Sequence, residues 1–261
     1  MLIKVKNGTY EQYEDLLLKR DQYRKEAGQI LISYTKEFGD LINTVFEKKI
    51  ECIRLKKTIA LCQAYINRGE AVDIYAMNTQ IEREMALYYA ELEEMLSKTR
   101  AAKDAALLPQ VTVMEVKRIY RKLAKLLHPD INPLTNSTPE AKDLWNRIVI
   151  AYHGNNLDEM KELEVLAAAV ISKMGGDEIE IDIPDIEEKI VRLEREINEI
   201  LTTEPYTFKR ILTDAELISE KKETLKAELE EFEKYSQELK QTLDQMLIGA
   251  GRKVTWRMNL R

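Results

Sequence analysis

The fold is decided by residues 115–130, which read EVKRIYRKLAKLLHPD. Apolar residues recur in this stretch every three or four positions up to Leu127, which is the spacing of one face of an α-helix. Positions 117–125 hold five basic side chains and no acidic one, so this helix carries a basic face within a protein of net charge −6. The helix is expected to end before a loop that opens with the tripeptide His128-Pro129-Asp130.

A second helix is expected after this loop. Thr138 and Pro139 supply an N-cap and a first-turn proline, and Gly154 supplies a stop. Asn156 is then expected to cap a further helix. The central part of the chain is therefore predicted to form three consecutive helices, the first two of which are joined by the loop described above.

The first two helices and their loop resemble the J-domain of the DnaJ co-chaperone family, over about residues 112–165. In J-domains the second helix typically reads Glu, apolar, two basic or polar residues, a small or apolar residue, Tyr, Arg, Lys, Leu and Ala, and His-Pro-Asp follows three residues later. Residues 115–130 fit this pattern without a gap. The family's third helix carries an aromatic residue, an Ile three positions later and then an Ala-Tyr pair, which here are Trp145, Ile148, Ala151 and Tyr152.

The resemblance implies a partner and a mechanism. J-domains dock their basic helix face on an acidic, nucleotide-dependent groove of a DnaK-type chaperone, and their tripeptide loop triggers ATP hydrolysis by that partner. Pro129 would stiffen the loop, and Asp130 would accept a charge-assisted hydrogen bond from an arginine of the partner. The implied partner-binding residues are His128, Pro129 and Asp130 in the loop and Lys117, Arg118, Arg121, Lys122 and Lys125 on the helix. The implied core, which holds the two helices antiparallel, is Tyr120, Leu123, Leu127, Trp145, Ile148, Ala151 and Tyr152.

Two parts of the family pattern differ here. Most J-domains open with a short helix that carries Tyr and then Leu and Gly, whereas residues 101–109 read AAKDAALLP; a long preceding helix could take its place. The family's fourth helix often carries Gln-Lys-Arg, whereas residues 155–160 read NNLDEM and are acidic. The glycine-rich and zinc-binding regions of full-length DnaJ have no counterpart in the sequence, so client binding through them is not expected.

Helical periodicity also covers both sides of the central module. Before it, apolar residues repeat at helical spacing over three stretches, the last of which is capped by Asp73. After it, residues 186–200 and 225–246 carry apolar residues that step by four and three, as in coiled coils. Pairing of these two seams with each other would form a hairpin, and pairing between two copies would form a homodimer. We therefore predict an all-α protein with an N-terminal helical hairpin or bundle (1–104), a J-domain-like antiparallel helix pair (105–175) and a C-terminal coiled-coil hairpin with a basic tail (176–261).

Composition and the remaining residues argue against several classes of function. The net charge of −6 argues against a nucleic-acid-binding protein, because phosphate binding needs a basic surface. No apolar run approaches about 18 residues and the first residues lack the apolar core of a signal peptide, so a cytoplasmic protein without a membrane partner is expected. Cys52 and Cys62 lie about 15 Å apart along a predicted helix, which is too far for a disulfide. No phosphate-binding glycine loop, zinc-ligand set or nucleophile elbow occurs, so no enzyme activity, cofactor or metal is expected.

Two functions follow from the sequence. The first is a J-domain-containing co-chaperone that binds a DnaK-type chaperone and stimulates its ATPase, while the helical arms bind a client or an assembly partner of unknown identity. The second is a structural interaction protein whose J-like module no longer stimulates a chaperone and only separates coiled-coil arms. An adaptor that binds nucleic acid through the basic helix is a third interpretation, based on local charge alone.

Overall fold

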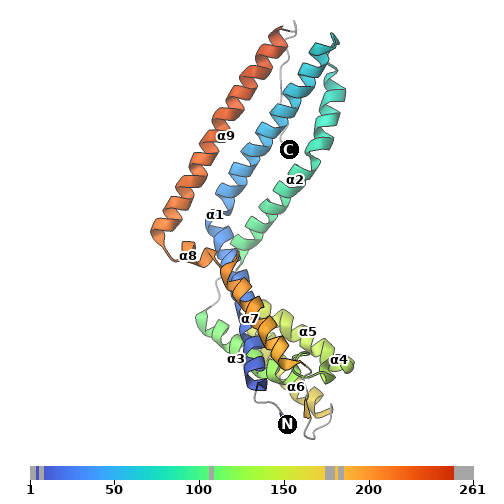
Figure 1. Cartoon of the computed structure of the whole chain (residues 1–261), viewed down its shortest axis with the longest axis vertical. Coiled ribbons are helices and arrows are strands. Elements are labelled where there is room, and N and C mark those ends of the chain that lie inside the picture. Colours follow the sequence, from blue (N-terminus) through green and yellow to red (C-terminus); the bar gives the residue numbers. More distant parts are fainter. Residues whose placement is uncertain (1–3, 6–8, 106–108, 174–179, 182–184, 250–261) are drawn as a thin grey trace. The chain divides into compact units, whose positions relative to one another are not determined.

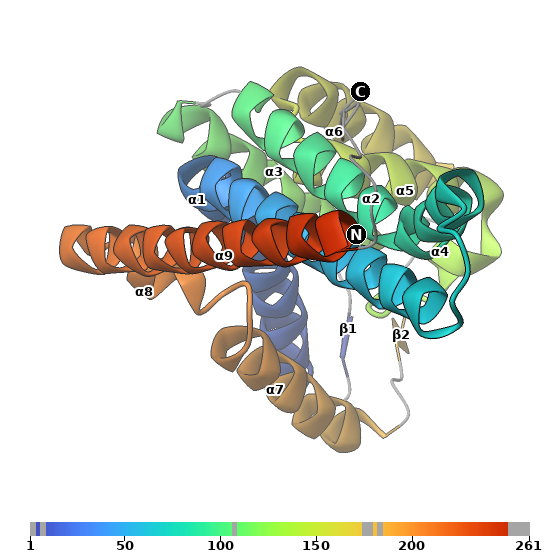
Figure 2. The same cartoon turned by 90° about the horizontal axis from the view of Figure 1, so that it is seen from above.

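The computed structural model describes residues 4–5, 9–105, 109–173, 180–181 and 185–249 (Figure 1). These residues are almost entirely helical, so the predicted all-α class is confirmed. Two strands of two residues each, β1 (Lys4–Val5) and β2 (Glu180–Ile181), pair in parallel and lie next to each other in Figure 2. The predicted basic tail lies outside the described residues.

The contacts divide the chain into two compact units, each built from segments far apart in the sequence. Unit 1 consists of residues 1–31 and 106–208, and unit 2 of residues 32–105 and 209–261. The long helix α1 (Tyr10–Asn67) contributes its first part to unit 1 and its second part to unit 2. The three regions predicted from the sequence are consecutive stretches of the chain and not groups of contacting segments, so that division stays a prediction.

Unit 1 places the central module against the first part of α1. Thr138 occupies the N-cap position of α5 and Pro139 its first turn, while the Asn156 side chain accepts a hydrogen bond from the Glu159 N–H at 3.1 Å at the start of α6. The cap predicted at Asn156 is thus confirmed, whereas Thr138 occupies the predicted N-cap position of α5 but its side chain forms no capping hydrogen bond. Besides α1, the helices of unit 1 are α3 (Gln110–Leu127), α4 (Leu134–Ser137), α5 (Pro139–His153), α6 (Leu157–Lys173) and α7 (Ile186–Thr202).

Unit 1 has two clusters of buried apolar residues. The first cluster joins α3, α5 and α6 and includes Leu18 of α1. All seven residues assigned above to the core of the central module are buried in it. The second cluster lies between α1 and α7 and contains Tyr10, Tyr13, Leu17, Ile131, Ile186, Ile190 and Leu193. The first part of α1 therefore packs on the module with one side and on α7 with another.

Unit 2 is formed by the second part of α1 with α2 (Ile74–Asp104), α8 (Phe208–Leu212) and α9 (Ala215–Gly249). Helices α2 and α9 pack against α1 and flank it in Figure 1. The side chain of Asp73 accepts a hydrogen bond from the Ala76 N–H at 2.9 Å, which confirms the predicted cap of α2. At Gly39 of α1 a Cβ atom would lie 2.8 Å from Oγ1 of Thr99 on α2, so glycine permits a close approach of these two helices.

Two predictions about the flanking helices are wrong in detail. The first two apolar stretches before the module belong to one continuous helix, α1. Buried residues at its start belong to clusters of unit 1, and those further along belong to clusters of unit 2. The two C-terminal seams also do not pair as a hairpin among the described residues. The seam of α7 is covered by the first part of α1, and the seam of α9 is covered by α1 and α2. Apolar periodicity indicates that a helix has a packing partner but does not say which one.

Candidate functional site

The loop that follows α3 is closed by hydrogen bonds at both ends. The His128 N–H donates to the carbonyl of Ala124 at 2.9 Å, and the His128 carbonyl accepts from the N–H groups of Ile131 and Asn132 at 2.9 and 2.7 Å. The side chain of Asn132 donates back to the carbonyl of Leu126 at 2.9 Å. Because the backbone is hydrogen-bonded on both sides of the tripeptide, the path of the loop is fixed.

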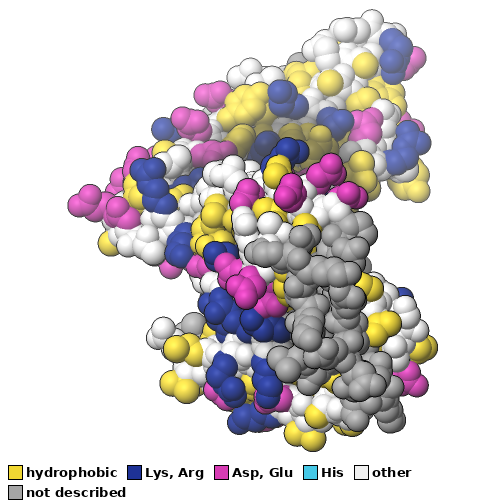
Figure 3. All heavy atoms as spheres, turned by 60° about the horizontal axis from the view of Figure 1, so that its bottom comes forward, with side chains coloured by type: hydrophobic (Ala, Val, Ile, Leu, Met, Phe, Trp, Pro, Cys, Tyr) yellow, Lys and Arg dark blue, Asp and Glu magenta, His cyan; other side chains and the backbone are white. Residues whose placement is uncertain are grey.

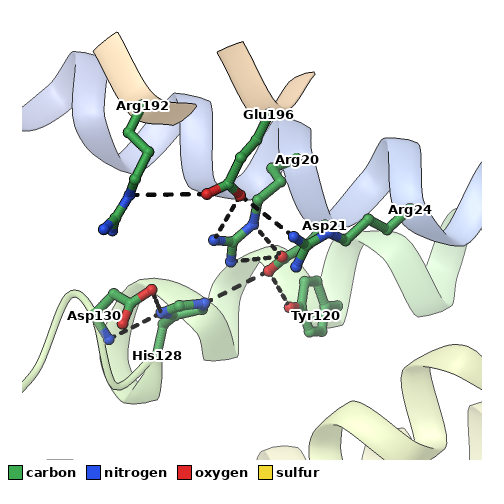
Figure 4. Close-up of polar contacts among 8 residues, drawn as sticks. All are labelled: Arg20, Asp21, Arg24, Tyr120, His128, Asp130, Arg192 and Glu196. Atoms are coloured by element: carbon green, nitrogen blue, oxygen red, sulfur yellow. Dashed lines mark hydrogen bonds and ion pairs between the residues drawn. The ribbon is translucent and has the colours of Figure 1, made fainter. Parts of the chain in front are cut away.

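The imidazole of His128 points into the protein. Its side chain is 7% exposed, its Nδ1 accepts a hydrogen bond from the Asp130 N–H at 3.1 Å, and its ring meets that of Trp145 edge-on. Since Nδ1 accepts, the proton of the neutral ring is on Nε2, which lies 3.6 Å from a carboxylate oxygen of Asp21 (Figure 4). His128 is therefore not offered to a partner, and it fixes the backbone of Asp130 instead.

Asp130 is the member of the tripeptide that faces outward. Its side chain is 50% exposed, whereas Pro129 is partly buried. The next residue, Ile131, is fully buried in the cluster between α1 and α7. Ile131 thus anchors the loop from behind while the carboxylate of Asp130 remains accessible.

Asp21, on the first part of α1, gathers the polar groups behind the loop. Its carboxylate accepts hydrogen bonds from the hydroxyl of Tyr120 at 2.7 Å and from the guanidinium of Arg20 at 3.0 and 3.2 Å. Burial alone would raise the pKa of Asp21, but the contacts with His128 and Tyr120 and the charge of Arg20 outweigh burial and lower that pKa to about 2. Burial and the same carboxylate raise the pKa of Tyr120, so its hydroxyl remains a donor.

The polar network continues from α1 to α7. Glu196 of α7 lies 3.8 Å from Arg20, 3.3 Å from Arg24 and 3.8 Å from Arg192 (Figure 4). Arg20 therefore links the carboxylate of Asp21 to that of Glu196, and through them the loop after α3 to α7. The sequence did not single out any of these α1 and α7 residues. They are far from the tripeptide in the sequence and share no local pattern with it.

The five basic residues lie on α3, and four of them have a polar neighbour from the same chain. Arg118 pairs with Glu115 of its own helix at 2.8 Å, and Lys122 pairs with Glu164 of α6 at 2.8 Å. The other two contacts come from the first part of α1: Arg121 donates to the side-chain oxygen of Gln22 at 3.1 Å, and Lys125 forms a short ion pair with Glu14. Burial, together with the charge of Arg121, lowers the pKa of Lys117.

Lys25 of α1 is a second unforeseen feature beside α3. Its side chain is buried, its ammonium lies 3.8 Å from the ring centroid of Tyr152, and its Nζ has no hydrogen-bond partner. Burial and the nearby charge of Lys117 lower the pKa of Lys25 to about 8. The Tyr152 ring in turn stacks on that of Tyr120, with centroids 3.7 Å apart. The cation–π contact partly compensates for the loss of solvation of this amine.

The first part of α1 is attached mainly by apolar contacts. Leu17 and Leu18 are 1% and 6% exposed, and burial of such a side chain stabilises by about 1.5–3 kcal/mol. A surface ion pair such as Lys125–Glu14, in which only the lysine is well exposed, contributes about 0–1 kcal/mol. The apolar contacts therefore determine the position of α1. The polar contacts determine which charged side chains of α3 are paired within the chain.

Comparison with protein-family models, with curated proteins and with solved structures finds no match to this chain. The resemblance to J-domains stays a prediction that rests on the residues quoted above. Among the described residues there is no cluster of three or more His, Cys, Asp or Glu side chains that could hold a metal ion. In the same part of the chain no helix is long and apolar enough to cross a membrane.

The chemistry of this site is suited to binding a partner. It offers one outward carboxylate, at Asp130, on a loop fixed from behind, and next to it an exposed helix face that carries several cations. Figure 3 shows, on the face that it presents, Lys and Arg side chains lying directly beside Asp and Glu side chains. Such a surface is suited to recognise a protein partner with both acidic and basic groups.

Proposed function

We propose that this chain is a cytoplasmic co-chaperone of the J-domain type. In this proposal the module of α3, the tripeptide loop and α5 binds a DnaK-type chaperone and stimulates its ATPase, and the remaining helices bind a client or an assembly partner. The observation that carries the proposal is the exposed carboxylate of Asp130, held beside the basic face of α3 by a loop that is bonded at both ends. The chain itself makes or breaks no bond, so we assign it no enzyme activity.

The proposed mechanism divides the work between steering and triggering. The exposed ammonium and guanidinium groups of α3 attract the acidic surface of the chaperone, and this attraction should weaken as salt is added. Asp130 then accepts a charge-assisted hydrogen bond from an arginine of the chaperone. This bond is directional, so the position of the carboxylate matters more than its charge alone.

We propose for His128 a role other than direct contact with the chaperone. Its Nδ1 accepts the N–H of Asp130, and its ring is buried against Trp145. His128 is therefore proposed as a positioning residue, which acts on the partner only through Asp130. Pro129 adds stiffness between the two because its ring restricts the backbone.

The test is steady-state ATP hydrolysis by a bacterial DnaK-type chaperone, with and without the full chain. The Asp130→Asn variant keeps the size of the side chain but removes its charge, so stimulation should be lost while helicity is unchanged. Asp15→Asn, an exposed carboxylate of α1 that pairs with Lys19, is the matched control and should stimulate as well as the parent. Equal stimulation by the parent and Asp130→Asn would rule out the proposed mechanism.

The alternative of a structural interaction protein has less support. It requires free seams on α7 and α9, and most of the apolar residues of both seams are packed against helices of the same chain. Its test is the molar mass in solution: a stable dimer that depends on the seam residues would favour it, and a monomer would not.

A further inference from the structure

We propose that two carboxylates of this chain, Glu14 and Glu164, pair with lysines of the basic face of α3. They thereby compete with an acidic protein partner for these lysines. The inference rests on the proposed function in that the partner is taken to be the DnaK-type chaperone. It goes beyond that function because it names what the partner must displace and what its surface must carry.

In both ion pairs the lysine is more exposed than the glutamate, which allows the lysine to exchange one carboxylate for another. Lys125 and Lys122 have side chains that are 55% and 60% exposed, whereas their partners Glu14 and Glu164 are 16% and 24% exposed. The carboxylates are thus held by the fold, and the ammonium groups are at the ends of long, accessible side chains. A lysine needs only a change of rotamer to leave one carboxylate for another.

The competition is local and does not require α1 to leave. One turn after Glu14, Leu17 and Leu18 are buried in the two clusters of unit 1, and Ile131 packs on the same helix. Release of the first part of α1 would expose all of these residues, while exchange of a lysine between carboxylates exposes none. Glu14 and Glu164 therefore set the affinity of the surface and do not act as an on–off switch.

The two ion pairs also describe the partner. Lys122 and Lys125 are three positions apart on one helix, so they lie next to each other on the same face. This face already accommodates two carboxylates, one from α1 and one from α6. The partner that replaces them is expected to present at least two carboxylates on its surface, close enough together to reach two lysines whose Cβ atoms are about 5–6 Å apart.

The first experiment measures charge exposure without any chaperone. The full chain and its variants are eluted by salt from immobilised poly-L-glutamate, a carboxylate probe. Glu14→Gln and Glu164→Gln should elute at higher salt than the parent, and Glu84→Gln controls for net charge, since Glu84 pairs with Lys57 in unit 2. Equal elution of the three variants would overturn the proposal.

The second experiment measures the Kd for the ATP-bound chaperone. Glu14→Gln and Glu164→Gln should each bind about two- to fivefold more tightly than the parent, which is the range of exposed ion pairs. A Lys125→Ala background should remove the effect of Glu14→Gln but not that of Glu164→Gln.

The two experiments separate the two proposals. Tighter retention on poly-L-glutamate with no chaperone binding by any of the proteins would reject the proposed function but keep the competition. Chaperone binding by the parent that neither glutamine variant strengthens would keep the proposed function and reject the competition. Circular dichroism of each variant checks that the helices are intact.

Discussion

Asp21 is predicted to stabilise unit 1 by an amount that can be worked out from its surroundings. Its pKa of about 2 in the folded protein compares with 3.8 for an ordinary aspartate. A pKa difference of one corresponds to about 1.4 kcal/mol, so the ionised carboxylate contributes about 2 kcal/mol to the free energy of unfolding. The side chain is 14% exposed, which is buried enough for this conversion to hold.

The perturbation is Asp21→Asn, which keeps the size of the side chain and removes its charge. Because the folded pKa is depressed, the stabilisation is fully present above pH 3.8 and is lost as the pH falls toward 2. At pH 7 the variant should therefore be less stable than the parent by about 2 kcal/mol. The difference should shrink steadily between pH 4 and pH 2 as the parent becomes protonated too.

The assay is urea unfolding followed by tryptophan fluorescence at a series of pH values. The chain has two tryptophans, so a Trp256→Phe background leaves Trp145, which lies in the core of unit 1 against His128. The control is Asp15→Asn in the same background, whose exposed carboxylate should contribute less than about 1 kcal/mol. A difference at pH 7 no larger than that of the control, or one that persists unchanged at pH 2, would refute the reasoning.

Three further predictions concern buried groups. Lys25→Met should stabilise unit 1 at pH 7, because it removes the cost of burying a charged amine. Burial lowers the pKa of Lys25 to about 8 in the folded protein, against 10.5 for an ordinary lysine, so this gain should fade between pH 8 and 10.5. Urea unfolding at a series of pH values measures the change. Ile131→Ala should lower the free energy of unfolding by about 2–5 kcal/mol, measured in the same way, and a loss below about 1 kcal/mol would mean that Ile131 does not anchor the loop. Gly39→Ala should destabilise unit 2 by about 1–3 kcal/mol through its clash with Thr99, and Thr99→Ala should recover part of the loss in thermal melts; an additive double variant would contradict the clash.

The features that were predictable are those encoded by neighbouring residues. The caps at Asp73 and Asn156, the proline at the start of α5 and the end of α3 before His128 all depend on side chains within four residues of the backbone that they serve. The all-α class follows from periodicity in the same local way.

The features that were missed depend on contacts between distant segments. Asp21 meets Tyr120 across 99 positions, and Arg24 meets Glu196 across 172. A charged residue on a solvated helix face and one that reaches another helix look the same in a single sequence, because only packing distinguishes them. For the same reason the sequence could not predict that His128 is buried. It also could not predict which residues lie next to Lys122 on the basic face of α3.

The division of α1 between the two units has a consequence for biosynthesis. The first part of α1 finds its final neighbours only in α3 to α7, and its second part is covered by α9 as well as α2. At roughly 5–20 residues per second, α7 leaves the ribosome roughly 10–30 s after the residues of α1 that it covers. A nascent chain stopped before α7 therefore carries a long helix with uncovered Tyr10, Tyr13 and Leu17, and neither unit can be completed until most of the chain has been made.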